Sequence, residues 1–152
     1  MNIVKADSMT ELLGEEQVRV ILSEPLLMRL AYEDAEGWPV VQPVWFIFQD
    51  GQLLTTVEKG SRKAVRLQAD NRCYFTIDTS GEGGTYGVRG RAHVSQSTDQ
   101  HLAERILRAS LRKYLGSEEG PTAEALLQDI AEGNLVVLHL QPVKYAAWKY
   151  PA

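Results

Sequence analysis

Cysteine is nearly absent from the chain, whose 152 residues include Cys73 and no other thiol. A single thiol can neither close an intramolecular disulfide nor complete a zinc site built from cysteines. Structural disulfides belong to oxidising compartments, so this composition favours a cytoplasmic protein. Cys73 stands among alternating apolar residues, and we expect it to be a small core residue.

Long hydrophobic runs are also missing. No segment approaches the roughly 18 apolar residues that span a bilayer. The first ten residues lack the basic and then apolar order of a secretion signal. We therefore expect a soluble protein that contacts no membrane. A chain of this length builds one core, which predicts a single domain over residues 1–152.

The residue patterns of common hydrolases and metalloenzymes do not occur. The sequence contains no HExxH, no GxSxG and no phosphate-binding P-loop. The histidines His93, His101 and His139 lack ligand-like spacing, so we expect no metal site. His93 and His139 fall inside apolar strand patterns, where we expect packed and hydrogen-bonded side chains.

Basic residues are fewer than acidic ones, 16 against 20, which gives a formal net charge of −4. An acidic chain is a poor partner for nucleic acid or an anionic membrane. The charge is unevenly distributed, because residues 59–113 are net basic and both flanking segments are net acidic. The basic centre predicts a local site for an anion, with chance scatter of charge as the alternative.

Segments rich in β-branched and aromatic residues indicate a mainly β protein with flanking helices. Strand patterns fall at residues 26–32, 40–48, 53–57, 71–78, 86–95, 135–140 and 143–148, the last two separated by Pro142. Helical patterns fall at residues 10–22, 62–69, 99–115 and 122–131, with Ser8 or Thr10 as candidate caps of the first. Short turns between most strands favour an antiparallel barrel over a parallel sheet.

The most informative local feature is the segment 55–63. A strand ends there at Gly60, and Ser61 is placed to cap the following helix. Three cations surround this helix start: Lys59, Arg62 and Lys63. Cations are unfavourable beside the positive end of a helix unless an anion binds there. The segment predicts a phosphate site, to which Thr56 and Ser61 would add hydroxyl donors; the alternative is a solvated basic turn.

A second candidate segment comprises Pro43, Val44, Trp45 and Phe46, in the middle of the second expected strand. A flat heterocycle can bind along such a strand through backbone groups, with Pro43 marking an edge position. Taken alone, alternation of Trp45 and Phe46 between core and interface is the simpler interpretation.

Together these segments resemble the flavin-binding split-barrel superfamily, which comprises the pyridoxamine 5′-phosphate oxidase-like proteins and their deazaflavin (F420)-dependent relatives. The resemblance extends from residue 26 to residue 148. It is carried by residues 28–31, 36–37, 39–46, 50–51, 60–63, 67, 88–92 and 136–148. It implies a six-stranded antiparallel split β-barrel that forms a homodimer, with two cofactors at the subunit interface.

The resemblance also implies roles for individual residues. It places the cofactor phosphate on Ser61, Arg62 and Lys63, with Thr56 nearby, and the isoalloxazine ring along residues 43–46. It brings Trp148 toward the ring from the partner subunit. No side chain stands out as a catalytic acid or base, so the catalytic residues stay unassigned.

The activity implied is that of an oxidoreductase that binds FMN or F420 and transfers hydride to or from a small organic substrate. True vitamin B6 oxidases end in an Arg-Leu-x-Pro pattern, whereas this chain has His139-Leu140-Gln141-Pro142, so we expect a different substrate. The alternative is a non-catalytic carrier or sensor of flavin or haem, with His93 or His139 as the axial ligand of a haem.

Overall fold

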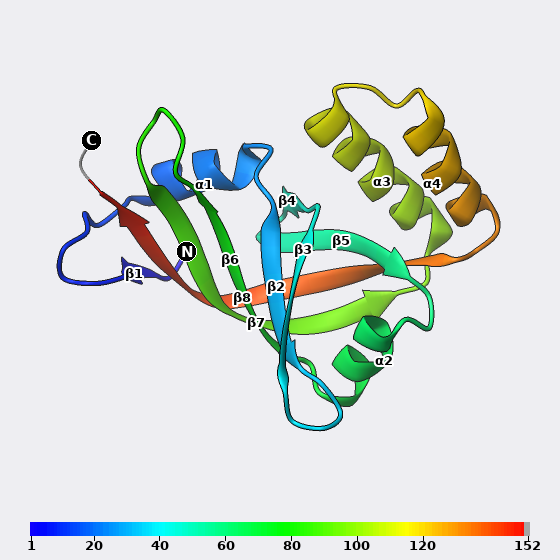
Figure 1. Cartoon of the computed structure of the whole chain (residues 1–152), viewed down its shortest axis with the longest axis horizontal. Helices are drawn as coiled ribbons and strands as arrows, with labels where there is room; N and C mark the ends of the chain where they lie inside the picture. Colours follow the sequence, from blue (N-terminus) through cyan, green and yellow to red (C-terminus); the bar gives the residue numbers. More distant parts are fainter. Residues whose placement is uncertain (151–152) are drawn as a thin grey trace.

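A computed structural model describes residues 1–150, which form one sheet flanked by helices (Figure 1). The strands are β1 (Ile3–Lys5), β2 (Met28–Glu33), β3 (Pro39–Val44), β4 (Ile47–Gln49), β5 (Gln52–Glu58), β6 (Arg72–Thr79), β7 (Tyr86–Ser97) and β8 (Leu135–Lys149). The helices are α1 (Glu15–Ser23), α2 (Arg62–Ala69), α3 (Gln100–Leu115) and α4 (Pro121–Ala131).

The sheet has the strand order β3-β2-β6-β7-β8-β5-β4, with antiparallel pairing between neighbours. β1 lies off this path and pairs in parallel with the second half of β8. The sheet does not close, because β3 and β4 form its two ends. The predicted mainly β split barrel with flanking helices is confirmed, although residues 1–150 contain eight strands where six are expected.

The two ends of the sheet are joined by a very short piece of chain. Trp45 and Phe46 connect β3 at one end to β4 at the other. A chain advances at most about 3.6 Å per residue, so this connection holds the two ends near each other and curls the sheet. The expectation of one strand over residues 40–48 is therefore wrong, because the segment contributes to β3 and β4, which lie at the two ends of the sheet.

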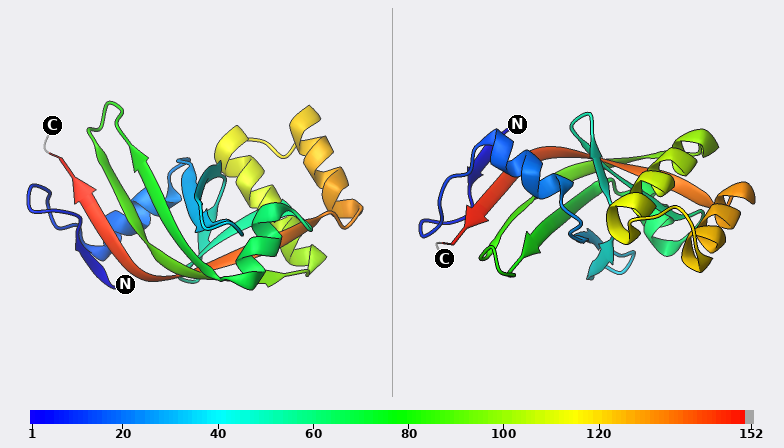
Figure 2. Two further views of the ribbon diagram at one scale, coloured as in Figure 1. Left: turned by 60° about the horizontal axis from the view of Figure 1, so that its bottom comes forward. Right: turned by 90° about the horizontal axis from the view of Figure 1, so that it is seen from above.

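Alternation along the strands buries one face of the sheet. In β2, Met28 and Leu30 are fully buried opposite Ile77 and Phe75 of β6, while Arg29 and Glu33 are exposed. The buried face packs against α1 in the main core. A second apolar cluster lies between α3, α4 and the strands β5 and β8. α3 and α4 therefore cover the end of the molecule opposite β1, as Figure 2 shows.

The last strand is longer than expected. Residues 135–149 form one continuous strand, β8, rather than two strands separated by Pro142. The pairing with β7 shifts at this point, because Arg91 faces Lys144 and the next residue, Ala92, faces Pro142. A β-bulge accommodates a proline that a regular ladder would exclude. β8 can thus pair with β5 in its first half and with β1 in its second.

The first helix begins later than predicted. Gly14 precedes α1, and its N–H donates to the Gln17 side chain at 2.8 Å. Thr10 donates its hydroxyl to the Asp7 carbonyl instead of capping the helix. The other three helices match their expected ranges to within one residue. In residues 1–150, no helix has the length and apolar character needed to cross a membrane.

Candidate functional site

A cavity of about 980 Å³ opens between two separate parts of the sheet. One wall is the β2–β3 hairpin, which contributes Tyr32, Asp34, Val40 and Gln42. The other wall is the end of β5 with the start of α2, which contributes Thr56, Glu58, Ser61, Arg62 and Lys63. The cavity is large enough for a cofactor-sized molecule.

Ser61 caps α2, as the sequence predicts. Its backbone is extended, and its Oγ accepts a hydrogen bond from the N–H of Ala64 at 3.2 Å. Gly60, with φ of +73°, makes the tight turn that precedes the cap. The first backbone N–H groups of a helix have no partners within the helix, so the cavity receives donors and the positive helix end together.

The two cations of this helix start have no ion-pair partner among residues 1–150, although the carboxylates of Asp34, Glu36 and Glu58 line the same cavity. Other arginines of the chain form ion pairs, whereas Arg62 and Lys63 form none within the described residues. Lys63 is half-buried, and this burial lowers the pKa of its ammonium group. A desolvated cation without a counter-charge favours the binding of an anion.

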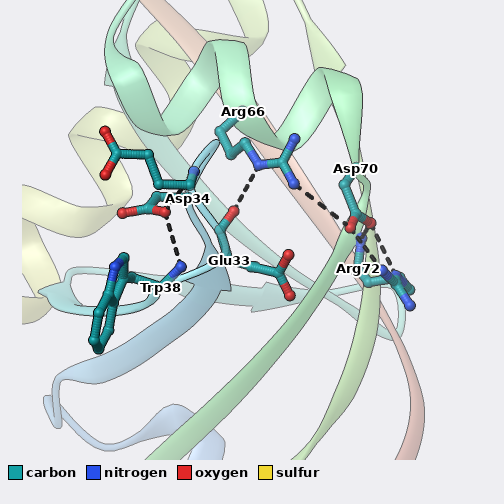
Figure 3. Close-up of polar contacts among 7 residues, drawn as sticks. Glu33, Asp34, Trp38, Arg66, Asp70 and Arg72 are labelled. Carbon is teal, nitrogen blue, oxygen red and sulfur yellow. Dashed lines mark hydrogen bonds and ion pairs between the residues drawn. The ribbon is translucent and has the colours of Figure 1, made fainter.

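A polar network ties the hairpin wall to α2 (Figure 3). Arg66 of α2 donates from Nε to the Glu33 carbonyl at 2.7 Å, and its Nη2 lies 4.0 Å from Asp70. Asp70 also binds the Arg72 guanidinium, which holds the pKa of that carboxyl well below its usual range. These contacts connect the start of β6, the end of β2 and α2 beside the cavity.

The turn of the hairpin is held by Asp34. Its carboxylate accepts hydrogen bonds from the backbone N–H groups of Glu36 and Trp38, both at 2.9 Å. The Trp38 side chain points away from this turn, and 69% of its surface is exposed (Figure 3). Asp34 therefore shapes the cavity wall, and part of its hydrogen-bonding capacity is already used.

The structure brings four of the ten predicted site residues together. Thr56, Ser61, Arg62 and Lys63 line the cavity. Lys59 is exposed in the turn before α2 but does not line it. That these residues contact a cofactor stays a prediction from the sequence.

The segment 43–46 lies outside the cavity of its own chain. Pro43 is exposed and Val44 half-buried, at the end of β3. Trp45 stacks on Tyr114 of α3 with ring centroids 5.2 Å apart, and Phe46 is completely buried. Trp45 and Phe46 follow β3 rather than lying in the middle of a strand, which corrects that expectation. The role assigned to this segment at the flavin ring stays a prediction.

Trp148 is also distant from the cavity. It is half-buried near the end of β8, where its ring lies over Gly87 and 5.7 Å from the Arg89 guanidinium. This end of β8 lies at one end of the molecule, and α2 lies in the other half, beside α3 and α4 (Figure 2). Trp148 could therefore approach a molecule in the cavity only from another copy of the chain.

The two strand histidines differ. His139 is half-buried with Nδ1 3.1 Å from the Gln52 side-chain oxygen, which confirms the expected packing, and burial lowers its pKa. His93 is exposed and makes no side-chain hydrogen bond within residues 1–150, so the expected packing is wrong there. Cys73 is 7% exposed in the main core, as predicted.

The hairpin wall was missed by the sequence interpretation. Tyr32, Asp34 and Gln42 line the cavity, but the local sequence of β2 and β3 indicates only a strand, a turn and a strand. Tyr32 continues the buried alternation of Met28 and Leu30, so its pattern indicates a core residue. The one available signal is chemical, because tyrosine carries a hydroxyl that a purely apolar core position does not need.

Structures of other proteins show the same architecture. A conserved hypothetical protein from Mycobacterium tuberculosis has a TM-score of 0.79 at 17% identity, covering 96% of this chain and 90% of that one. An F420 reductase has a TM-score of 0.69 at 18% identity, covering 88% and 98%. The haem storage protein from Vibrio cholerae has a TM-score of 0.65 at 15% identity, covering 89% and 93%. At these identities the likeness shows the fold alone.

The sequence comparison identifies the family. No curated protein matches the chain, but the family model described as pyridoxamine 5′-phosphate oxidase matches residues 15–149. This match extends from the start of α1 to the end of β8 and includes both walls of the cavity. The chain therefore belongs to the pyridoxamine 5′-phosphate oxidase family, which confirms the resemblance found in its sequence.

Proposed function

We propose that this protein is an oxidoreductase that binds FMN or F420 in the cavity and transfers hydride to or from a small organic substrate. One observation carries the proposal: two cations without ion-pair partners among the described residues, Arg62 and Lys63, stand at a capped helix start inside a cavity of cofactor size. The family and the F420 reductase with the same fold support this choice of cofactor.

The residues present fit a phosphate-bearing cofactor. The Arg62 guanidinium can donate two parallel hydrogen bonds to phosphate oxygens, and the half-buried Lys63 ammonium adds a point charge. Ser61 and Thr56 supply hydroxyl groups on the same wall. FMN and F420 both carry a phosphate on a ribityl arm, so this anchor can serve either cofactor.

The cofactor supplies the hydride chemistry, and the protein binds and orients it. The α2 wall would hold the anionic end, and the apolar surfaces of Val40 and Val57 would limit water near the remainder. We propose that the substrate is not a vitamin B6 phosphate, because His139 stands where the true oxidases have an arginine. The single thiol supports a cytoplasmic setting.

We further propose that two copies form a dimer through the outer face of β3, β2 and β6. Val41, Ala31 and Tyr74 lie side by side across these strands, and 62% of the Val41 surface is exposed. Trp38 is exposed at the end of the hairpin. A cluster of exposed apolar side chains around an edge strand is typical of a surface that another chain covers.

Cofactor titration tests the anchor. FMN and F420 are added separately to the purified protein, and binding is followed by the change in their absorption or fluorescence. In the double variant Arg62→Ala with Lys63→Ala, we expect the affinity for the bound cofactor to fall about a hundredfold, because two charge-assisted contacts are lost. The matched control, Lys5→Ala with Arg105→Ala, removes two exposed cations outside the cavity and should keep wild-type affinity.

The results separate the candidate functions. Equal cofactor affinity in the double variant and the wild type would contradict the phosphate anchor. A cofactor that binds but cannot be reduced and reoxidised with small-molecule donors and acceptors would favour a carrier over an enzyme. A haem spectrum that is lost in His139→Ala or His93→Ala, without flavin binding, would replace the proposal by a haem-binding function.

A further inference from the structure

Tyr32 occupies a distinctive place in the wall opposite α2. It is the last inward-facing residue of β2, and only 9% of its surface is exposed. It lines the cavity together with Asp34 and Arg62. Its ring packs in the main core, so its position is fixed by the sheet rather than by a mobile loop.

The hydroxyl of Tyr32 has no protein partner. It forms no hydrogen bond with any of residues 1–150, and it is not among their buried polar atoms that lack a partner. The hydroxyl is therefore not fully buried. Tyr32 lines a smaller hollow beside Cys73 and Tyr74 as well as the cavity, but the charges that act on its hydroxyl are those of Asp34 and Arg62, which both line the cavity, so we place the hydroxyl there. Buried tyrosines usually find a partner for this group, so a donor is left available for a bound molecule.

The charges around Tyr32 define what the hydroxyl can do. Burial and the Asp34 carboxylate raise the pKa of the phenol, and Arg62 acts in the opposite sense. Tyr32 thus stays protonated at neutral pH and remains a hydrogen-bond donor. Asp34 accepts two backbone hydrogen bonds in its own turn, whereas Arg62 has no ion-pair partner in the described chain and can attract an anion.

From this arrangement we propose that the Tyr32 hydroxyl donates a hydrogen bond to the phosphate group held at the start of α2. The phosphate would then be gripped from both walls, by Arg62 and Lys63 on one side and Tyr32 on the other. This inference rests on the proposed function, because it needs a phosphate-bearing cofactor in the cavity.

A phosphate bound to both walls would restrain the β2–β3 hairpin. The β2–β3 hairpin lies at an end of the sheet, where β3 has β2 as its strand neighbour. In the protein alone, Arg66 ties this hairpin to α2 through the Glu33 carbonyl. A phosphate shared by Tyr32 and Arg62 adds a second tie, so binding of the cofactor stiffens β3.

The test compares a phosphorylated cofactor with the same molecule lacking the phosphate. We measure the affinities of FMN and riboflavin, or of F420 and its phosphate-free chromophore if the protein binds F420. Tyr32→Phe should weaken binding of the phosphorylated form at least tenfold and leave the phosphate-free form within twofold, because a hydrogen bond to a charged acceptor is lost. Tyr145→Phe is the matched control, since Tyr145 is 4% exposed and does not line the cavity.

Hydrogen exchange provides a second readout. In the wild type, FMN should slow exchange of the backbone amides of residues 39–44, and riboflavin should not. In Tyr32→Phe, FMN added at saturating concentration should lose most of this protection, while the melting temperature of the free variant stays close to that of the wild type. The melting temperature shows that the variant folds.

Each outcome has a defined meaning. Equal losses for FMN and riboflavin in Tyr32→Phe would place the hydroxyl elsewhere on the ligand and overturn the inference. Unchanged FMN affinity in Tyr32→Phe, with the Arg62 and Lys63 variant impaired, would overturn it and leave the proposed function intact. Unchanged affinity in the Arg62 and Lys63 variant, or no binding of either cofactor to the wild type, would contradict the proposed function and the inference together.

Discussion

Burial shifts the pKa of several side chains, and Cys73 and Lys63 show its two directions. Cys73 is 7% exposed, and the removal of water raises the pKa of its thiol to about 12. Its Sγ donates a weak hydrogen bond to the Ala92 carbonyl at 3.6 Å. Lys63 is half-buried at the cavity, and the same physical cause lowers its pKa, because burial disfavours whichever form carries charge. The thiol is thereby made inert, and the ammonium is made receptive to an anion.

The thiol of Cys73 should not react with a disulfide reagent in the native protein at pH 8. It is buried and protonated there, whereas the thiolate is the reactive form. We expect reaction to appear only when urea unfolds the chain, measured by the absorbance of the released thiolate. Rapid labelling of the native protein would contradict the burial of Cys73.

The same shift predicts a dependence of stability on pH. The unfolded thiol ionises near pH 9.0 and the folded thiol near pH 12, so the unfolded chain loses this proton first. The stability from Cys73 is fully present below pH 9 and is lost as pH rises toward 12. In urea titrations from pH 9 to pH 11, Cys73→Ala should lose less unfolding free energy than the wild type. Parallel losses in the two proteins would contradict the shift.

Residues differed in how well the sequence predicted them. The local sequence predicts Ser61 as the cap of α2 and places Arg62 and Lys63 at its start, because helix capping and charge at a helix start are local properties. The sequence does not indicate Tyr32 as a cavity residue. The opposite wall of the cavity is formed by β5 and α2, which follow Tyr32 in the chain. The alternation of residues along β2 indicates which of its side chains are buried, but it does not indicate that β5 and α2 lie opposite Tyr32.

Among the elements, β7 and β8 approach each other unusually closely. Gly90 of β7 lies where a Cβ atom would collide with the Lys144 carbonyl oxygen and come within 3.2 Å of the Phe75 ring. Glycine is needed here for space and not for a special φ angle. The bulge in which Pro142 sits begins directly after this point, between Arg91 and Ala92, and the two irregularities together bend the long ladder.

Gly90→Ala should destabilise the protein by at least about 2 kcal/mol, because strand backbones must separate to admit one methyl group. Gly81→Ala is the control, since an added Cβ there meets only the Thr79 hydroxyl at an ordinary 3.7 Å. Urea unfolding compares the two variants with the wild type. A Gly90→Ala variant as stable as Gly81→Ala would show that β7 and β8 can move apart freely.

The elements also show where sequence patterns stop. The sequence predicts both ends of the helix at residues 62–69, because its cap and its apolar spacing are local features. The sequence predicts two strands separated by Pro142 because a proline normally ends a ladder, and only the pairing with β7 shows the bulge that accommodates it. β1 is too short for a pattern, and it exists as a strand because the second half of β8 offers it a partner.

For the whole molecule, the open sheet exposes apolar surface on the side away from the main core. Val41 and Tyr74 flank Ala31 on this side, and Trp38 is exposed in the turn of the same hairpin. Pro39 and Pro43 occupy the same edge strand, where proline discourages further strand pairing. This combination favours contact between faces of two copies over edge-to-edge pairing.

The double substitution Trp38→Asp with Val41→Asp should convert the proposed dimer to a monomer. Two carboxylates in an apolar contact would be desolvated without partners. Sedimentation velocity at micromolar concentration measures the change, and Leu115→Asp, at a position 50% exposed on α3, should leave the oligomeric state unchanged. A wild-type chain that sediments as a monomer would contradict the dimer itself.

The position of β8 also determines when the cavity can form as the chain is made. β5, which carries one wall of the cavity, hydrogen-bonds in the sheet only to β4 and β8, so it joins the strands of the other wall through β8. Because β8 is the last strand of the described chain, a nascent polypeptide that ends before residue 135 has no sheet that unites both walls. Such distant pairings form late and slowly. The two walls of the cavity can therefore face each other across one sheet only in a chain that has been synthesised through β8.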